Sequence, residues 1–117
     1  MSDGTAKLEA SEWQSRLDEL TEQHEGAAVT IEVLDQEFGD EEEVEKLPLA
    51  YLAFDPKDDV VIVAVGGRDG RFPAVLRHLV EHPREIAVDS FGDGLVAVDI
   101  VDGEGGHTIV TIHRPAA

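Results

Sequence analysis

The sequence predicts an α+β domain, in which one N-terminal amphipathic helix packs on a twisted antiparallel sheet of six to eight strands. Apolar residues repeat with a helical period only near the N-terminus, and they alternate with a period of two from Ala27 onward. Glycine-rich turns separate the alternating runs about every twelve residues, which is typical of antiparallel strands. Parallel strands would need crossover helices, and no second strong helical stripe follows.

The edges of such a sheet need cover, because unpaired backbone groups attract other chains. Closure into a partial barrel would hide the long apolar edge. If the sheet stays open instead, one edge is expected to pair with a second copy, which would make the protein a homodimer.

The helix is expected to begin after Ser11, which with Gln14 has the spacing of a capping box. Gly26 is suited to end it, since glycine adopts the left-handed conformation that often follows a helix. Its narrow apolar stripe is made up of Trp13, Leu17 and Leu20. A stripe this narrow indicates a helix that lies on a sheet.

Seven segments are predicted to be strands from their alternation or continuous apolar character, namely residues 29–33, 42–47, 49–54, 60–65, 85–89, 95–101 and 107–113. Pro48 is expected at a sheet edge or at a break between the second and third, because proline cannot donate a ladder hydrogen bond. Residues 60–65 are apolar throughout, so this strand should be central and covered on both faces. Turns are expected at residues 55–59, 66–71, 92–94 and 102–106.

Residues 73–83 fit either a short helix or a strand that Pro83 ends. A helix would place His78 and His82 on one face. A strand would place Leu76, His78, Val80 and His82 on one side. The β-branched content and the surrounding strands favour the strand.

The chain of 117 residues is 42% apolar and contains no cysteine. We expect a single domain over residues 1–117, with residues 1–9 as a flexible N-terminus. No run reaches the ~20 apolar residues of a membrane span, and the first residues do not resemble a signal peptide. A cytoplasmic location is therefore expected.

The net charge of −17 excludes a general nucleic-acid binder, because phosphates require a basic surface, and it argues against anionic membranes. Residues 1–47 hold fifteen acidic and three basic residues, so the charge is concentrated in the N-terminal part. Colloidal solubility in a salty cytoplasm explains the acidity most simply. A surface for calcium or for a basic partner is the alternative.

The sharpest chemical motif is the segment from His78 to His82, which matches the H-x-x-E-H pattern of inverted zinc peptidases. That chemistry needs both imidazoles one helical turn apart and a third protein ligand. Pro83 follows at once, and the remaining chain is strand-like, so ordinary structural histidines are favoured. No catalytic, cofactor-binding or metal-binding residue is predicted, no cofactor is expected, and an enzyme is not the favoured interpretation.

Several short motifs occur together along the chain, at residues 11–13, 24–26, 29–34, 47–49, 58–62, 65–67 and 82–83. Over residues 11–114 they resemble a family of small acidic proteins known only as a domain of unknown function, of an actinobacterial or haloarchaeal type. The resemblance implies one helix followed by a mostly antiparallel sheet, and it favours the strand at residues 73–83. It implies no activity, cofactor or site residue.

The favoured function is that of a non-catalytic interaction or accessory domain, which binds a protein partner or a second copy of itself. A role under osmotic or other stress is part of this interpretation. The alternative is a small-ligand carrier or sensor with an anion-binding pocket. Its candidate residues are Arg77, His78, His82 and Arg84, because basic side chains are otherwise rare. A metal-dependent hydrolase that uses His78 and His82 is an outsider.

Overall fold

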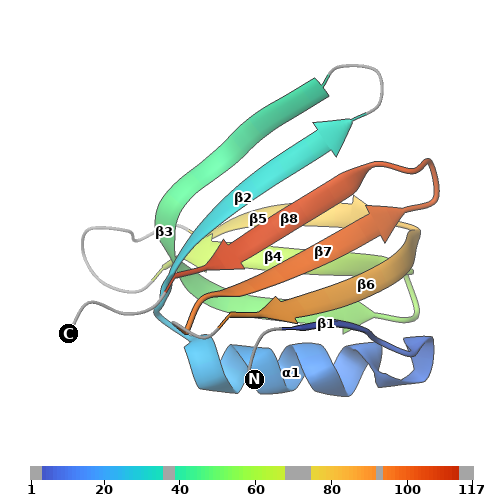
Figure 1. The fold of residues 1–117 in the computed structure, drawn as a ribbon, viewed down its shortest axis with the longest axis horizontal. Coiled ribbons are helices and arrows are strands. Elements are labelled where there is room, and N and C mark those ends of the chain that lie inside the picture. Colours follow the sequence, from blue (N-terminus) through green and yellow to red (C-terminus); the bar gives the residue numbers. More distant parts are fainter. Residues whose placement is uncertain (1–3, 36–38, 68–74, 92–93, 114–117) are drawn as a thin grey trace.

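The structure is a computed structural model that describes residues 4–35, 39–67, 75–91 and 94–113 (Figure 1). One α-helix lies against an eight-stranded antiparallel sheet, which confirms the predicted α+β class. The elements in chain order are β1 (Gly4–Lys7), a 3-10 turn (Ala10–Glu12), α1 (Trp13–His24), β2 (Ala28–Asp35), β3 (Gly39–Asp55), β4 (Val60–Gly66), β5 (Val75–Glu81), β6 (Pro83–Ser90), β7 (Val96–Asp102) and β8 (His107–Ile112).

The strand order in the sheet is β1-β6-β7-β8-β2-β3-β4-β5, and every neighbouring pair is antiparallel. Two meanders, β2–β5 and β6–β8, meet where β8 pairs with β2. Among the described residues β1 and β5 end the sheet, which is therefore a partial barrel that stays open.

Of the two alternatives for Pro48, the break is wrong, because residues 39–55 form one strand of 17 residues. Pro48 lies opposite Ala28, and the next residue, Leu49, donates its N–H to the Ala27 carbonyl at 2.8 Å. Since antiparallel hydrogen bonds alternate along a strand, the nitrogen of Pro48 points away from β2. Its missing N–H therefore costs no hydrogen bond of this ladder.

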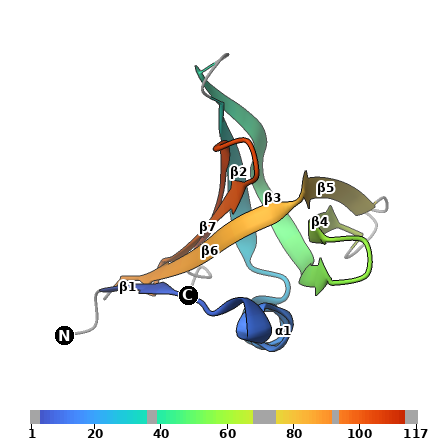
Figure 2. The same ribbon diagram turned by 90° about the vertical axis from the view of Figure 1, so that its right-hand side faces the viewer.

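The long strand β3 belongs to two parts of the sheet (Figure 2). Its first part, residues 39–48, pairs with β2. We call this part, together with β1, β2, β6, β7 and β8, the large half of the sheet. Its last part, residues 49–55, pairs with β4 and forms the small half with β4 and β5. In Figure 2 the helix α1 lies below the small half.

The core lies between the helix and the two halves of the sheet. The helix contributes its predicted stripe of Trp13, Leu17 and Leu20, all buried, and the Trp13 ring meets Phe54 edge-on at 5.2 Å. As predicted, β4 is buried along nearly its whole length and is paired on both sides. The alternation predicted for β8 is also confirmed, with Thr108, Val110 and Ile112 buried.

The predicted cap at Ser11 is wrong. A 3-10 turn precedes α1, and Glu12 donates its N–H to the Glu9 carbonyl at 2.8 Å, so the backbone satisfies this donor. The residue in the cap position is Glu12, and it makes no side-chain cap hydrogen bond. Gly26 follows the helix with a φ of 89°, in agreement with the prediction.

Part of the N-terminal segment for which we expected flexibility forms a strand. Residues 4–7 pair with β6 as β1, and Leu8 is buried behind them. The turns at residues 55–59 and 102–106 occur where predicted, while residues 68–71 and 92–93 lie outside the described residues. In the described part of the chain, no helix is long and apolar enough to cross a membrane.

Candidate functional site

Of the helix and the strand considered for residues 73–83, the structure contains the strand, over residues 75–81. This strand, β5, is the last of the small half of the sheet. Its outer edge can be located from one hydrogen bond: His82 donates its N–H to the Asp59 carbonyl at 2.8 Å. The register with β4 is unbroken, so alternation directs the backbone groups of Val80 and His78 toward β4. Those of Arg77, Leu79 and Glu81 point to the outer edge.

The opposite edge of the small half is covered by the helix. The backbone N–H of Leu52 on β3 donates to Thr21 Oγ1 at 2.9 Å, and the same hydroxyl lies 3.0 Å from the Leu52 carbonyl. These groups point away from β4, where β2 has already diverged from β3. A helical side chain therefore takes the place of a neighbouring strand at this edge.

The other end of the whole sheet is β1, and it differs from β5 in two respects. It has only four residues, and its Lys7 is exposed and forms an ion pair with Glu85 at 3.3 Å. Short edge strands that carry lysine resist pairing with other chains. By contrast, β5 has seven residues and exposes Leu76 and Leu79 by 55% and 51%.

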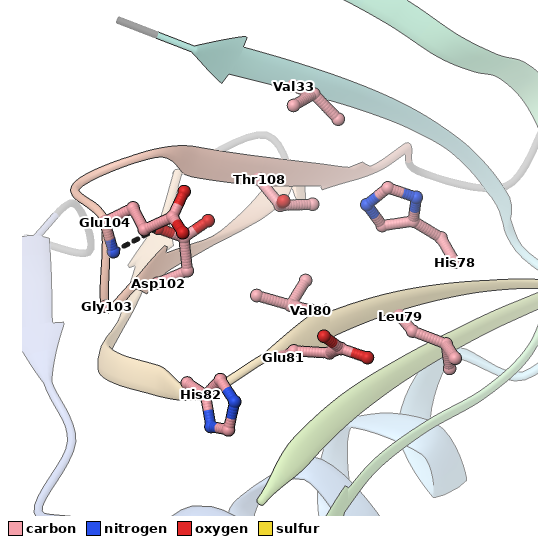
Figure 3. Close-up of a pocket in the computed structure, with 10 residues that line it drawn as sticks. All are labelled: Val33, His78, Leu79, Val80, Glu81, His82, Asp102, Gly103, Glu104 and Thr108. Carbon is pink, nitrogen blue, oxygen red and sulfur yellow. Dashed lines mark hydrogen bonds between the residues drawn. The ribbon is translucent and has the colours of Figure 1, made fainter.

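A cavity of about 560 Å³ lies beside the outer edge of β5 (Figure 3). One wall is the run of residues 78–82, which contributes side chains from both faces of the strand. The other wall consists of Val33 on β2, Thr108 on β8 and the turn between β7 and β8. The cavity is thus the opening of the partial barrel between its two halves.

The cavity is apolar in its middle and acidic at one end. Val80 and Thr108 are buried, and Val33 lies above them. The carboxylates of Glu81, Asp102 and Glu104 line the cavity, and the last two stand at the β7–β8 turn (Figure 3). Pro83 pairs with Asp102, so this turn lies next to the junction between β5 and β6.

The carboxylate of Asp102 also builds the turn. Its Oδ1 accepts hydrogen bonds from the N–H groups of Glu104 at 2.9 Å and Gly106 at 3.0 Å. This pattern explains why an aspartate begins the turn, since its side chain satisfies backbone donors two and four residues later. Glu104 and Glu81 are exposed to solvent.

The four candidates for an anion site do not converge. His78 and His82 line the cavity, whereas Arg77 and Arg84 do not. Strand alternation places Arg77 on the opposite face from His78, where its Nε donates to the Tyr51 hydroxyl at 3.0 Å. Arg84 is exposed on β6, beyond the junction.

His82 forms that junction in a left-handed conformation, with a φ of 54°. Its Nδ1 lies 3.2 Å from Asp59 Oδ2, and both side chains are more than half exposed. Asp59, at the end of the β3–β4 turn, has the same φ of 54°. The two residues face each other where the chain enters β4 and leaves β5.

The H-x-x-E-H motif does not have the geometry of a zinc peptidase. Its first four residues lie on a strand, which separates residues four positions apart by about 13 Å, whereas one helical turn would bring them together. Within the described ranges, no three His, Cys, Asp or Glu side chains are grouped so that they could hold a metal ion.

Two features of this region were missed in the sequence. Thr21 lies one residue beyond Leu20 on the helix, and a hydroxyl at the border of an apolar stripe is the one signal that pointed to it. The carboxylates of the β7–β8 turn were interpreted only as turn residues. Their place in the same cavity as Glu81 depends on the pairing of β6 with β7, which no local motif encodes.

Over the described residues, the fold and the cavity define a small α+β protein with an open antiparallel sheet, in which β5 has no neighbouring strand on its outer side. The chain belongs to a family of unknown function, DUF5335, whose model matches residues 4–117, which confirms the predicted resemblance to a family known only as a domain of unknown function. It is similar to an uncharacterized protein of Aquifex aeolicus (strain VF5), with 35% identity over 112 residues that cover 96% of this chain and 94% of the relative. No solved structure matches.

Proposed function

We propose that this chain is a non-catalytic interaction module that binds an extended segment of another protein, or of a second copy, by strand addition to β5. The observation that carries the proposal is the contrast between the two edges of the small half. The helix covers one edge through Thr21, whereas β5 presents outward backbone groups and two exposed leucines. Main-chain hydrogen bonds would supply affinity in such a complex, as in other cases of strand addition.

The position of the cavity supports the same proposal. An added strand would lie in the opening between β5 and the large half, next to the exposed Leu79 and the buried Val80. The backbone of the added strand would form hydrogen bonds with the outward-pointing backbone groups of Arg77, Leu79 and Glu81. The acidic composition supports a cytoplasmic accessory role under osmotic stress as part of this proposal.

The proposal is tested by amide hydrogen exchange with a neutral probe, the peptide acetyl-Ser-Ser-Val-Thr-Val-Thr-Val-amide. In the free protein the amides of Val80 and His78 should be protected, and those of Leu79 and Glu81 should exchange quickly. Saturation with the peptide should protect Leu79 and Glu81.

The matched variants are Leu79→Pro and Leu79→Ala. Proline removes the outward N–H, so it should abolish peptide binding, whereas alanine keeps this donor and should retain most of the binding. Self-association is followed in parallel by native mass spectrometry. If neither the peptide nor a second copy protects Leu79 and Glu81, strand addition is wrong.

A small-ligand carrier is the second candidate, favoured by the volume of the cavity and by the two histidines that line it. An anionic ligand would meet the carboxylates of Glu81, Asp102 and Glu104 in the same cavity, which favours the interaction module. Titration with inorganic phosphate, followed by the ring resonances of His78 and His82, tests the carrier. A saturable shift at millimolar phosphate or below would support it.

A further inference from the structure

We infer that the partner segment of β5 carries basic residues at its N-terminal end, continues with alternating apolar residues, and runs antiparallel to β5. This inference rests on the proposed strand addition and adds the chemistry and direction of the partner. It follows from three properties of the cavity, namely the direction of β5, the position of the carboxylates and the apolar middle.

The direction follows from the sheet. Every neighbouring pair of strands here is antiparallel, and antiparallel pairs are slightly more stable per residue than parallel ones. The strand β5 runs from Val75 to Glu81. An antiparallel partner therefore places its N-terminal end beside Glu81 and its C-terminal end beside Val75.

The charge follows from what surrounds that end. Glu81 is exposed on β5, and Glu104 is exposed across the opening, with Asp102 beside it (Figure 3). Gly103 of the turn lies close to the end of β5. A Cβ added to Gly103 would lie 3.5 Å from the carbonyl oxygen of His82. Lysine or arginine at the N-terminal end of the partner would thus meet carboxylates from both walls of the opening.

The apolar part follows from the alternation of side chains. Side chains of an added strand that point inward would extend the row of Val80 and would face Val33 and Thr108. The row needs an apolar residue at every second position of the partner. A second copy fits less well, because it carries the same net charge of −17 toward an acidic opening.

Two probe peptides with the same composition and charge test the inference. One is acetyl-Lys-Lys-Val-Thr-Val-Thr-Val-amide, with lysines at the N-terminal end, and the other is acetyl-Val-Thr-Val-Thr-Val-Lys-Lys-amide. Unspecific attraction to the acidic chain is equal for both peptides. We expect the first to bind about fivefold more tightly, as two partly exposed charge pairs would provide.

The charge is tested with two double variants that each remove two negative charges. Glu81→Gln with Glu104→Gln changes the cavity, and Asp18→Asn with Glu22→Gln changes the exposed side of α1. The first double variant should remove the preference between the two peptides. The second should weaken both peptides alike and leave the preference unchanged.

Equal affinity of the two peptides, or a preference for C-terminal lysines, would overturn the inference. The proposed strand addition would still stand in that case if the neutral peptide protects the Leu79 amide. The protein could instead form a dimer that is lost in Leu79→Pro and that neither lysine peptide dissociates. This result would identify the second copy as the occupant of β5 and would also overturn the inference. Loss of the preference only in the cavity variant would confirm it.

Discussion

The hydroxyl of Thr21 and the backbone of Leu52 are joined in both directions. Leu52 donates its N–H to Thr21 Oγ1 at 2.9 Å, and Oγ1 lies 3.0 Å from both the Leu52 and the Leu17 carbonyl oxygens. Leu52 is 1% exposed, so its backbone groups have no ready access to solvent. The docking of α1 therefore satisfies polar groups of the sheet in addition to burying apolar surface.

Thr21→Val should destabilise the protein by about 1–3 kcal/mol, because it keeps the shape of the side chain but leaves the Leu52 groups without a hydrogen bond. Thr21→Ser keeps the hydroxyl and should cost no more than about 0.8 kcal/mol for the lost methyl group. Urea unfolding of the two variants measures both values. Equal losses would show that the hydroxyl is not what holds the helix on β3.

At position 82, glycine should be more stable than alanine by about 1 kcal/mol. The φ of 54° lies in the left-handed region, which disfavours any residue with a Cβ. Both variants lose the exposed contact with Asp59, so their difference isolates the backbone conformation. Thermal or urea unfolding of His82→Gly and His82→Ala gives the comparison, and a more stable alanine variant would contradict the left-handed junction.

Burial of His24 lowers its pKa below the ordinary value of 6.5, although its place in the last turn of α1 would favour the charged form. Between the lowered pKa and 6.5, the unfolded chain binds the proton more readily than the folded one. The contribution of neutral His24 to stability is therefore complete above pH 6.5 and is lost as the pH falls through this window.

The difference in unfolding free energy between the wild type and His24→Gln, measured from pH 7.5 to pH 5, tests this sign. The wild type should lose stability relative to the variant as the pH falls. Because both proteins carry the other histidines, their titration cancels in the difference. A difference that grows toward low pH would mean that the folded state prefers the charged imidazole.

Leu79→Ala should leave the free energy of unfolding within about 0.5 kcal/mol of the wild type, since the side chain is 51% exposed. Ile100→Ala, at a fully buried position, should cost about 2–5 kcal/mol. If Leu79 proves to stabilise the fold as strongly as Ile100, its exposure is not available for a partner.

The sequence was sufficient for the helix and for most strands, because the apolar period of each segment matches the face that it buries. It failed where a residue has a strong local preference that the sheet does not use. Proline usually interrupts strands, but the nitrogen of Pro48 points away from β2. Serine often caps helices, but at Ser11 the backbone of the 3-10 turn satisfies the N–H of Glu12 instead.

The site was less predictable, because it depends on which distant segments meet. Arg77 and His78 are adjacent in the chain, yet strand alternation sends them to opposite faces. Two of the three carboxylates that accompany His78 and His82 in the cavity come from the β7–β8 turn, about twenty residues further along the chain. Sequence adjacency therefore suggested a basic cluster, while the fold assembles an acidic one.

The shared strand β3 has a mechanical consequence. Its residues 39–48 serve the large half and its residues 49–55 serve the small half, so strain on either half is transmitted directly along one continuous backbone. A segment wedged between β5 and Thr108 would press the two halves apart, and β3 near Pro48 would have to bend in response. The thickness of a segment that can be accommodated thus depends on how easily β3 bends near Pro48, and on the second link between the halves, the junction of β5 and β6 at His82 and Pro83.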